Sequence, residues 1–222
     1  MNNLSYRPEY RRHLPHLQPE GATFFVTFRL IDAVPRVTVK QWQEEKQALE
    51  LELSSLKEEN ERAERRRRFH RQRFAQLENL LDSSTDGEHW LKDAALAQIV
   101  CEAFHHRDGK EYRLDAFCVM SNHVHALFMP LAQADAEQPV QALQKIMHGL
   151  KRFTSLQCNK LLGRGGSFWE AESFDHYCRN HDEWIRVLHY ILNNPVKAGI
   201  VENWRDFPFS YCSEAALKYV TL

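Results

Sequence analysis

Three short apolar runs in the chain have the composition of β-strands. Residues 21–31, GATFFVTFRLI, are rich in aromatic and β-branched side chains. Residues 112–120, YRLDAFCVM, and residues 124–130, VHALFMP, are equally apolar, and only the short turn SNH lies between them. These two runs predict a β-hairpin, and the first run predicts a separate strand. A further short strand is expected within the glycine-rich residues 163–177.

Apolar side chains at helical spacing predict helices between and after these strands. Residues 90–106 and 139–162 each carry an amphipathic pattern, and residues 181–194 are expected to be helical up to Pro195. Strands and helices therefore alternate along the chain. This order predicts an α+β layered domain built on a mostly antiparallel sheet.

Residues 36–86 differ from the rest of the chain because they contain neither glycine nor proline. Glutamate dominates the first part of this segment and arginine the second, a composition that favours helix. The pattern fits either one long helix or a helical hairpin whose acidic and basic arms pair. Its role is equally open between a solvated structural arm and an element that contacts nucleic acid.

The bulk composition narrows the class of protein. The net charge of the 222 residues is −1, so any nucleic-acid partner has to be recognised through local charge. The five cysteines form no CxxC pair and are expected to be reduced thiols in a cytosolic protein. No secretory signal is expected at the N-terminus, and no apolar run reaches the roughly 18–20 residues of a membrane span.

Two histidines stand one residue apart in the run SNHVHALFMP. In a strand, His123 and His125 would point to the same side of the sheet, and Val124 to the other. They are either core histidines with local hydrogen-bond partners or half of a metal site. Imidazole suits several divalent metals, so the pair alone does not select one.

The helical stretch HYILNNP offers two more polar groups on one face. Tyr190 and Asn194 are four residues apart and therefore share a helix face. They offer a nucleophile and a neutral ligand together. Alternatively, Tyr190 packs with its hydroxyl at the rim of the core, and Asn194 caps the helix before Pro195.

The four side chains together suggest attack by a tyrosine oxygen on a phosphodiester. A phenol is protonated at neutral pH and is a poor nucleophile, so a nearby divalent cation that polarises the phosphoryl oxygen would assist it. The products would be a 5′-phosphotyrosine and a free 3′-OH. Because the bond energy is kept, a second strand could be joined by the reverse reaction.

Several blocks of the sequence resemble one known family. FCVMSNHVHALFMP resembles the HUH motif (His, hydrophobic, His) of the IS200-like single-tyrosine transposases. HYILNNPVKAGIVENWRDFPFSY resembles the tyrosine-bearing helix and tail of the REP-associated tyrosine transposases. RRHLPHLQPEGATFFVTFRLIDAVP and KRFTSLQCNKLLGRGGSFWEAESFDHYCRN are similar to the opening arm and strand and to the basic helix of that group. The resemblance covers the chain outside residues 40–88.

The resemblance implies a fold, a reaction and a location. The fold is a single domain over residues 1–222, a ferredoxin-like antiparallel sheet with helices on one face. A charged helical insertion would span about residues 36–88, and a C-terminal tail about residues 200–222. The implied activity is that of a metal-dependent endonuclease and strand transferase acting on single-stranded, hairpin-forming palindromic DNA. The implied location is cytoplasmic and nucleoid-associated, as a monomer or a homodimer.

The resemblance also assigns roles to residues. His123 and His125 correspond to the ligands of Mg²⁺ or Mn²⁺, and Tyr190 to the nucleophile. Asn194 falls where relatives place a polar side chain, often glutamine, as a further ligand. Candidate DNA contacts are basic or aromatic residues that could track a strand or stack on bases: Arg11, Arg12, Lys151, Arg152, Phe168 and Trp169.

Two other interpretations remain open at the level of sequence. One is a non-catalytic hairpin-binding protein that retains the fold. The other is a zinc-stabilised binding protein that uses His123 and His125 with the thiol of Cys118. His176, in FDHY, either assists the site or makes a structural hydrogen bond.

Overall fold

The computed structural model describes residues 10–11, 15–16, 21–83, 87–131 and 143–220. The chain divides into two compact units. Residues 1–29 and 90–222 form the first, which we call the sheet unit, and residues 30–89 form the second, which we call the hairpin unit. The predicted insertion falls within the hairpin unit.

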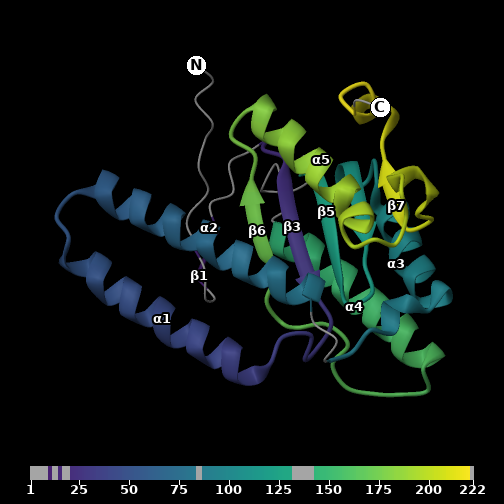
Figure 1. The fold of residues 1–222 in the computed structure, drawn as a ribbon, viewed down its shortest axis with the longest axis horizontal. Helices are drawn as coiled ribbons and strands as arrows, with labels where there is room; N and C mark the ends of the chain where they lie inside the picture. The colour runs from purple at the N-terminus through teal and green to yellow at the C-terminus, as the bar shows by residue number, and fades with distance from the viewer. Residues whose placement is uncertain (1–9, 12–14, 17–20, 84–86, 132–142, 221–222) are drawn as a thin grey trace. The chain divides into compact units, whose positions relative to one another are not determined.

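The sheet unit contains a five-stranded antiparallel sheet in the order β6-β3-β5-β4-β7 (Figure 1). Its strands are β3 (Phe24–Arg29), β4 (Tyr112–Val119), β5 (His123–Pro130), β6 (Phe174–Tyr177) and β7 (Ser210–Cys212). Two further strands, β1 (Tyr10–Arg11) and β2 (Pro15–His16), pair with each other in a separate small sheet. The strands predicted from the apolar runs are therefore present, close to their expected bounds.

The order of elements in the sheet unit is that of a ferredoxin-like fold. Its helices are α3 (Ala94–Arg107), α4 (Leu143–Leu161), α5 (His181–Lys197) and α6 (Glu214–Leu217), with 3-10 turns η1 (Trp90–Lys92) and η2 (Trp204–Asp206). The succession β3-α3-β4-β5-α4-β6 is a β-α-β-β-α-β unit, to which β7 adds an edge strand. The predicted α+β class with an antiparallel sheet is confirmed. Residues 139–142 of the predicted second helix lie outside the described residues.

Helices lie on both faces of the sheet. On one face, the ring of Phe28 lies 6.3 Å from Phe104 of α3, and the ammonium of Lys151 on α4 lies 5.8 Å from the Phe28 ring. On the other face, Phe25 meets Tyr190 of α5 at 5.9 Å. Successive side chains of a strand point to opposite faces, so Phe25 and Phe28 report opposite sides. The two helices of the ferredoxin-like unit share one face, as expected, and α5 adds a helix to the other.

The start of α5 is fixed by a capping arrangement that sets the position of Tyr190. The side chain of Asn180 accepts a hydrogen bond from the Glu183 amide at 2.9 Å, and the Glu183 carboxylate accepts one from the Arg179 amide at 2.8 Å. The first bond satisfies an amide of the first turn, and the second ties the residue before the cap to the helix.

The end of α5 differs from the sequence prediction. The helix continues through Pro195 to Lys197 instead of ending before the proline. The missing proline N–H falls in the last turn, so its absence breaks only one helical hydrogen bond. The Ala198 amide then bonds to the Asn194 carbonyl at 3.0 Å, which closes the helix.

The hairpin unit consists of two long helices, α1 (Arg36–Ser55) and α2 (Glu59–Ser83). Arginines of α2 pair with glutamates of α1: Arg65 with Glu52, Arg66 with Glu50, and Arg73 with Glu45. Of the two arrangements left open by the sequence, the structure has the hairpin with pairing arms. Within the described part of the chain, no helix is both long enough and apolar enough to cross a membrane.

Candidate active site

The site begins with the first residues of β5, which carry the two histidines. In the sheet, His125 lies opposite Thr27 of β3 on one side and Cys118 of β4 on the other. Because β5 is flanked by strands on both sides, its backbone is held by two ladders of hydrogen bonds. The directions of the two imidazoles are therefore set by the centre of the sheet and not by a loop.

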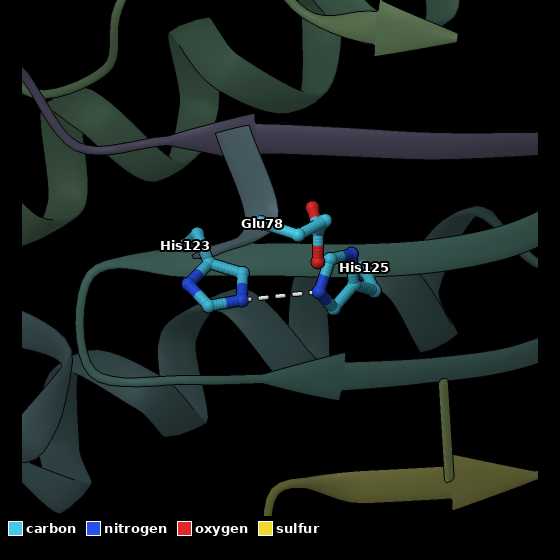
Figure 2. Close-up of side chains that lie close together, drawn as sticks. All are labelled: Glu78, His123 and His125. Atoms are coloured by element: carbon cyan, nitrogen blue, oxygen red, sulfur yellow. Dashed lines mark hydrogen bonds between the residues drawn. The ribbon is translucent and has the colours of Figure 1, made fainter. Parts of the chain in front are cut away.

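The two imidazoles point toward one another. The Nε2 atoms of His123 and His125 lie 3.0 Å apart, and Figure 2 shows the rings converging. The opposite nitrogens are held by neighbours: Nδ1 of His123 lies 2.7 Å from Oδ1 of Asn122, and Nδ1 of His125 lies 2.8 Å from Oγ1 of Thr27. Glu78, also labelled in Figure 2, belongs to the hairpin unit. Within the sheet unit, the two imidazoles are the candidate metal ligands.

These contacts fix the tautomer of His123 and are compatible with two tautomers of His125. The amide oxygen of Asn122 is an acceptor, so Nδ1 of His123 carries the proton and its Nε2 accepts. Nε2 of His125 then donates to Nε2 of His123, and the Thr27 hydroxyl donates to Nδ1 of His125. In the other tautomer, Nδ1 of His125 carries the proton and donates a hydrogen bond to the Thr27 hydroxyl. With His125 in that tautomer, both Nε2 lone pairs are available to one cation. Metal-binding histidines typically have their other ring nitrogen held by a hydrogen bond, as Asn122 and Thr27 hold these two.

Helix α5 brings Tyr190 to the same face of the sheet. Its ring lies 5.4 Å from the His125 ring and 5.9 Å from the Phe25 ring, edge-on to both. Phe25 also stacks on His125 at 5.6 Å. The predicted nucleophile and the predicted metal pair are thus brought together within one chain.

Asn194 is buried, and its side chain has no hydrogen-bond partner among the described residues. It is 1% exposed, and neither its Oδ1 nor its Nδ2 is bonded to any described residue. An unsatisfied buried polar group costs about 1–3 kcal/mol, so such a group calls for a ligand outside the described chain. The side chain does not cap the helix, which continues past it. A buried, unpartnered amide one turn after Tyr190 fits a neutral ligand for a hard cation.

The basic candidates for DNA contact differ in their placement. Arg11 lies in β1, where its backbone pairs with Pro15, and Arg12 lies outside the described residues. Arg152 is exposed on α4 and remains a candidate.

Lys151 is engaged inside the protein. Its ammonium donates to the carbonyl oxygens of Glu170, Ala171 and Glu172 at 2.9, 3.2 and 3.2 Å. Burial, together with the positive charge of Arg29, lowers the pKa of Lys151 to about 7. The predicted DNA contact is corrected here, because all three donors of the ammonium already tie α4 to the 170–172 loop.

The two aromatic candidates belong to the core. Phe168 stacks on Trp90 at 5.2 Å, and Trp169 packs edge-on against Phe28 at 4.7 Å. The Trp169 indole also donates to Oγ1 of Thr154 at 2.8 Å. Phe168 is 0% exposed and Trp169 is 6% exposed. The predicted stacking on bases is corrected for both, because neither ring offers a free face.

His176, the histidine of the FDHY stretch, also has a partner in the structure. Nε2 of His176 lies 2.8 Å from Glu183, which joins β6 to the first turn of α5 and favours the structural interpretation of this histidine. Burial alone would raise the pKa of Glu183, but the Arg179 amide and His176 outweigh it, so that pKa is lowered.

The zinc interpretation loses its proposed thiolate ligand. The Cys118 thiol donates to the sulfur of Met120 at 3.6 Å, and it does not join the two histidines in a cluster of ligand atoms within 4.8 Å of one another. Burial also raises the pKa of Cys118 to about 12, which keeps the thiol protonated.

The sequence analysis missed the two side chains that orient the imidazoles. Thr27 is 98 residues away from His125 and reaches it only because β3 and β5 are neighbours. Asn122 is adjacent to His123 in sequence, and an amide beside an HxH pair was the one signal available for it.

A comparison with curated proteins agrees with the resemblance that the motifs indicate. No protein-family profile matches the chain. A curated protein of Haemophilus influenzae, provisionally named a REP-associated tyrosine transposase, is 28% identical over 102 residues, which are 43% of this chain and 56% of that protein. The match thus spans little more than half the length of the relative.

A solved structure described as the REP-associated tyrosine transposase bound to a REP hairpin aligns with a TM-score of 0.47 and 18% identity. The alignment covers 92% of this chain and 82% of the other. The curated relative bears out what the motifs around His123, His125 and Tyr190 indicate: this chain resembles the REP-associated tyrosine transposases.

Proposed function

We propose that this protein is a single-stranded DNA endonuclease and strand transferase that acts on hairpin-forming DNA through Tyr190. The observation that carries the proposal is the approach of Tyr190 to His125, whose Nε2 converges with that of His123. A tyrosine that served only as packing would not need a paired set of imidazole nitrogens beside it.

The proposed reaction is a transesterification. The phenolic oxygen of Tyr190 forms a bond to phosphorus while the bond between phosphorus and the 3′ oxygen breaks. The phenolic proton is lost, and the leaving 3′ oxygen is protonated. The products are a 5′-phosphotyrosine and a free 3′-OH. Attack by another 3′-OH on the same phosphorus breaks the bond between phosphorus and the Tyr190 oxygen, which regains a proton, and rejoins a strand.

The residues present fit a divalent cation held by two imidazoles and an amide oxygen, and Mg²⁺ or Mn²⁺ is proposed because of the resemblance to the REP-associated tyrosine transposases. His123 and His125 would hold it through their Nε2 atoms, and Asn194 would offer its amide oxygen. When bound, such a cation supplies Lewis-acid stabilisation of the charge that develops on the phosphoryl oxygens. Asn122 and Thr27 orient the two imidazoles, and Phe25 fixes the position of the Tyr190 ring.

Hairpin DNA is proposed as the substrate because of the resemblance to REP-associated tyrosine transposases. Arg152 is an exposed cation on α4 that is available for phosphate contact, and Arg11 lies in β1, within a basic segment of the sheet unit. The proposal also places the whole reaction within one chain, because Tyr190 lies beside the histidine of its own sheet.

The test is a covalent-adduct assay. The purified protein is incubated with labelled single-stranded palindromic hairpins and Mn²⁺ or Mg²⁺, and the products are separated on a denaturing gel. Wild type should give a slow protein–DNA band, and Tyr190→Phe should give none. Tyr211→Phe, a tyrosine whose ring stacks on Phe117, is the matched control and should keep the band.

A second candidate function is hairpin binding without cleavage. Retarded hairpin on a native gel, with no covalent band across several hairpins and both metals, would favour it and would remove Tyr190 from the catalytic role.

A further inference from the structure

The arginines of α2 differ in their partners: three pair with α1, Arg62 pairs with Glu59 of its own helix at 3.0 Å, and three others form no ion pair within the described residues. Arg65, Arg66 and Arg73 pair with glutamates of α1, and Arg73 also lies over the rings of Trp42 and Phe69 at 4.8 and 5.0 Å. These side chains link the two helices. Each of their positive charges is offset by a paired glutamate of α1.

Three other arginines of the same helix are exposed to solvent. Arg67, Arg68 and Arg71 are exposed, and none of them forms an ion pair within the described part of the chain. Arg67 and Arg71 are four residues apart and share a helix face, about 6 Å apart along the axis. Glu64, one turn earlier, is also exposed, so the three arginines leave a net positive charge on this stretch. We call these three residues the basic face of α2.

We propose that the basic face of α2 binds the phosphate backbone of the DNA on which the protein acts. This inference rests on the proposed function and names a surface that the reaction itself does not use. The guanidinium group presents a planar fork of donors that matches phosphate, and it stays charged at any physiological pH. Three such groups within two helical turns can contact neighbouring phosphates without reading base sequence.

The surroundings favour DNA over a protein partner. Protein interfaces have an apolar centre, and the large apolar residues exposed in the described part of the hairpin unit are Val37 and Leu51, both on α1. The neighbours of the basic face on α2 include Gln72 and Ala75, which are exposed and not large apolar groups. Such a surface suits contacts to the sugar–phosphate backbone.

The test is the salt dependence of hairpin binding. Each phosphate contact that is neutralised contributes about −0.9 to the slope of log Kobs against log [salt] on duplex DNA, and about −0.7 on single strands. The full-length triple variant R67Q/R68Q/R71Q should therefore have a slope that is shallower by about two to three. The triple variant K40Q/K57Q/K110Q removes the same charge from exposed lysines elsewhere and should keep the wild-type slope.

The outcomes separate this inference from the proposed function. A shallower slope for the arginine variant alone supports the basic face as a DNA contact. An unchanged slope, in a protein whose wild type still forms the Tyr190 adduct, overturns the basic face and leaves the proposed function standing. If the substitutions change the mass in sedimentation and not the slope, the face binds a second copy of the chain, and the inference is wrong. If wild type neither binds nor cleaves any hairpin, both proposals fall together.

Discussion

In the sheet unit, polar side chains converge on one face of β5, whereas in the hairpin unit they pair across two helices and leave the remainder exposed. His123, His125 and Tyr190 meet because strand register and helix capping place them. The arginines of α2 meet glutamates because long side chains on adjacent helices can reach one another. The first arrangement is rigid and specific; the second is adaptable and weak.

The comparison shows that a high density of charged residues does not by itself mark the functional site. A high density of charged residues marks the hairpin unit in sequence, but most of its arginine–glutamate pairs are partly exposed and contribute little to stability. The candidate site in the sheet unit contains few charged groups. It is marked by the converging imidazole nitrogens of His123 and His125 and by the buried amide of Asn194, which has no hydrogen-bond partner among the described residues.

The largest expected effect is loss of one imidazole. His125→Ala should lower the rate of adduct formation about a thousandfold or more, because a metal ligand is worth several kcal/mol of transition-state stabilisation. The rate is measured by quenched time courses with Mn²⁺. His106→Ala, an exposed histidine on α3, should leave it unchanged. A rate within a few-fold of wild type would remove the two histidines from the reaction.

The next largest effect is a loss of stability when the buried ring of Phe168 is removed. Phe168→Ala should reduce the free energy of unfolding by about 3–5 kcal/mol in urea denaturation, because it leaves a cavity beside Trp90. Phe168→Leu keeps most of the apolar volume and should cost less than about 1.5 kcal/mol. Stability equal to wild type, with weakened binding of hairpin DNA, would instead restore the base-stacking role.

A smaller effect is expected at the hydroxyl that supports His125. Thr27→Val keeps the shape of the side chain and removes the hydrogen bond to Nδ1, so Mn²⁺ affinity should fall about 10–100-fold. Titration calorimetry measures this, and Thr27→Ser should retain most of the affinity. Equal affinity in all three proteins would mean that Thr27 does not orient the imidazole.

The smallest effect is expected in the hairpin unit. Arg66→Gln removes the pair with Glu50 and should cost about 0.2–1 kcal/mol of stability at low salt, and less at about 1 M salt, where surface charges are screened. Arg67→Gln breaks no described ion pair and serves as its control. A loss of several kcal/mol for Arg66→Gln would mean that the two units do not differ in the way proposed.

The sequence allowed the sheet to be predicted, and the HxH pair and Tyr190 to be proposed as a site, because these inferences depend on short-range patterns. None of these patterns is longer than the eleven residues of the run 21–31. Lys151, Phe168 and Trp169 could not be placed, since a lysine suggests exposure and an aromatic residue fits a core as well as a base. Thr27 reaches His125 only through strand pairing, which sequence periodicity does not specify.

The central claim is tested most directly by locating the covalent bond to DNA. The wild-type adduct formed with a labelled hairpin and Mn²⁺ is digested with protease and nuclease, and the modified peptide is identified by mass spectrometry. The account predicts a nucleotide attached through its 5′ phosphate to Tyr190 in the peptide spanning HYILNNP. A nucleotide on any other residue, or cleaved DNA without a protein-linked product, would contradict it.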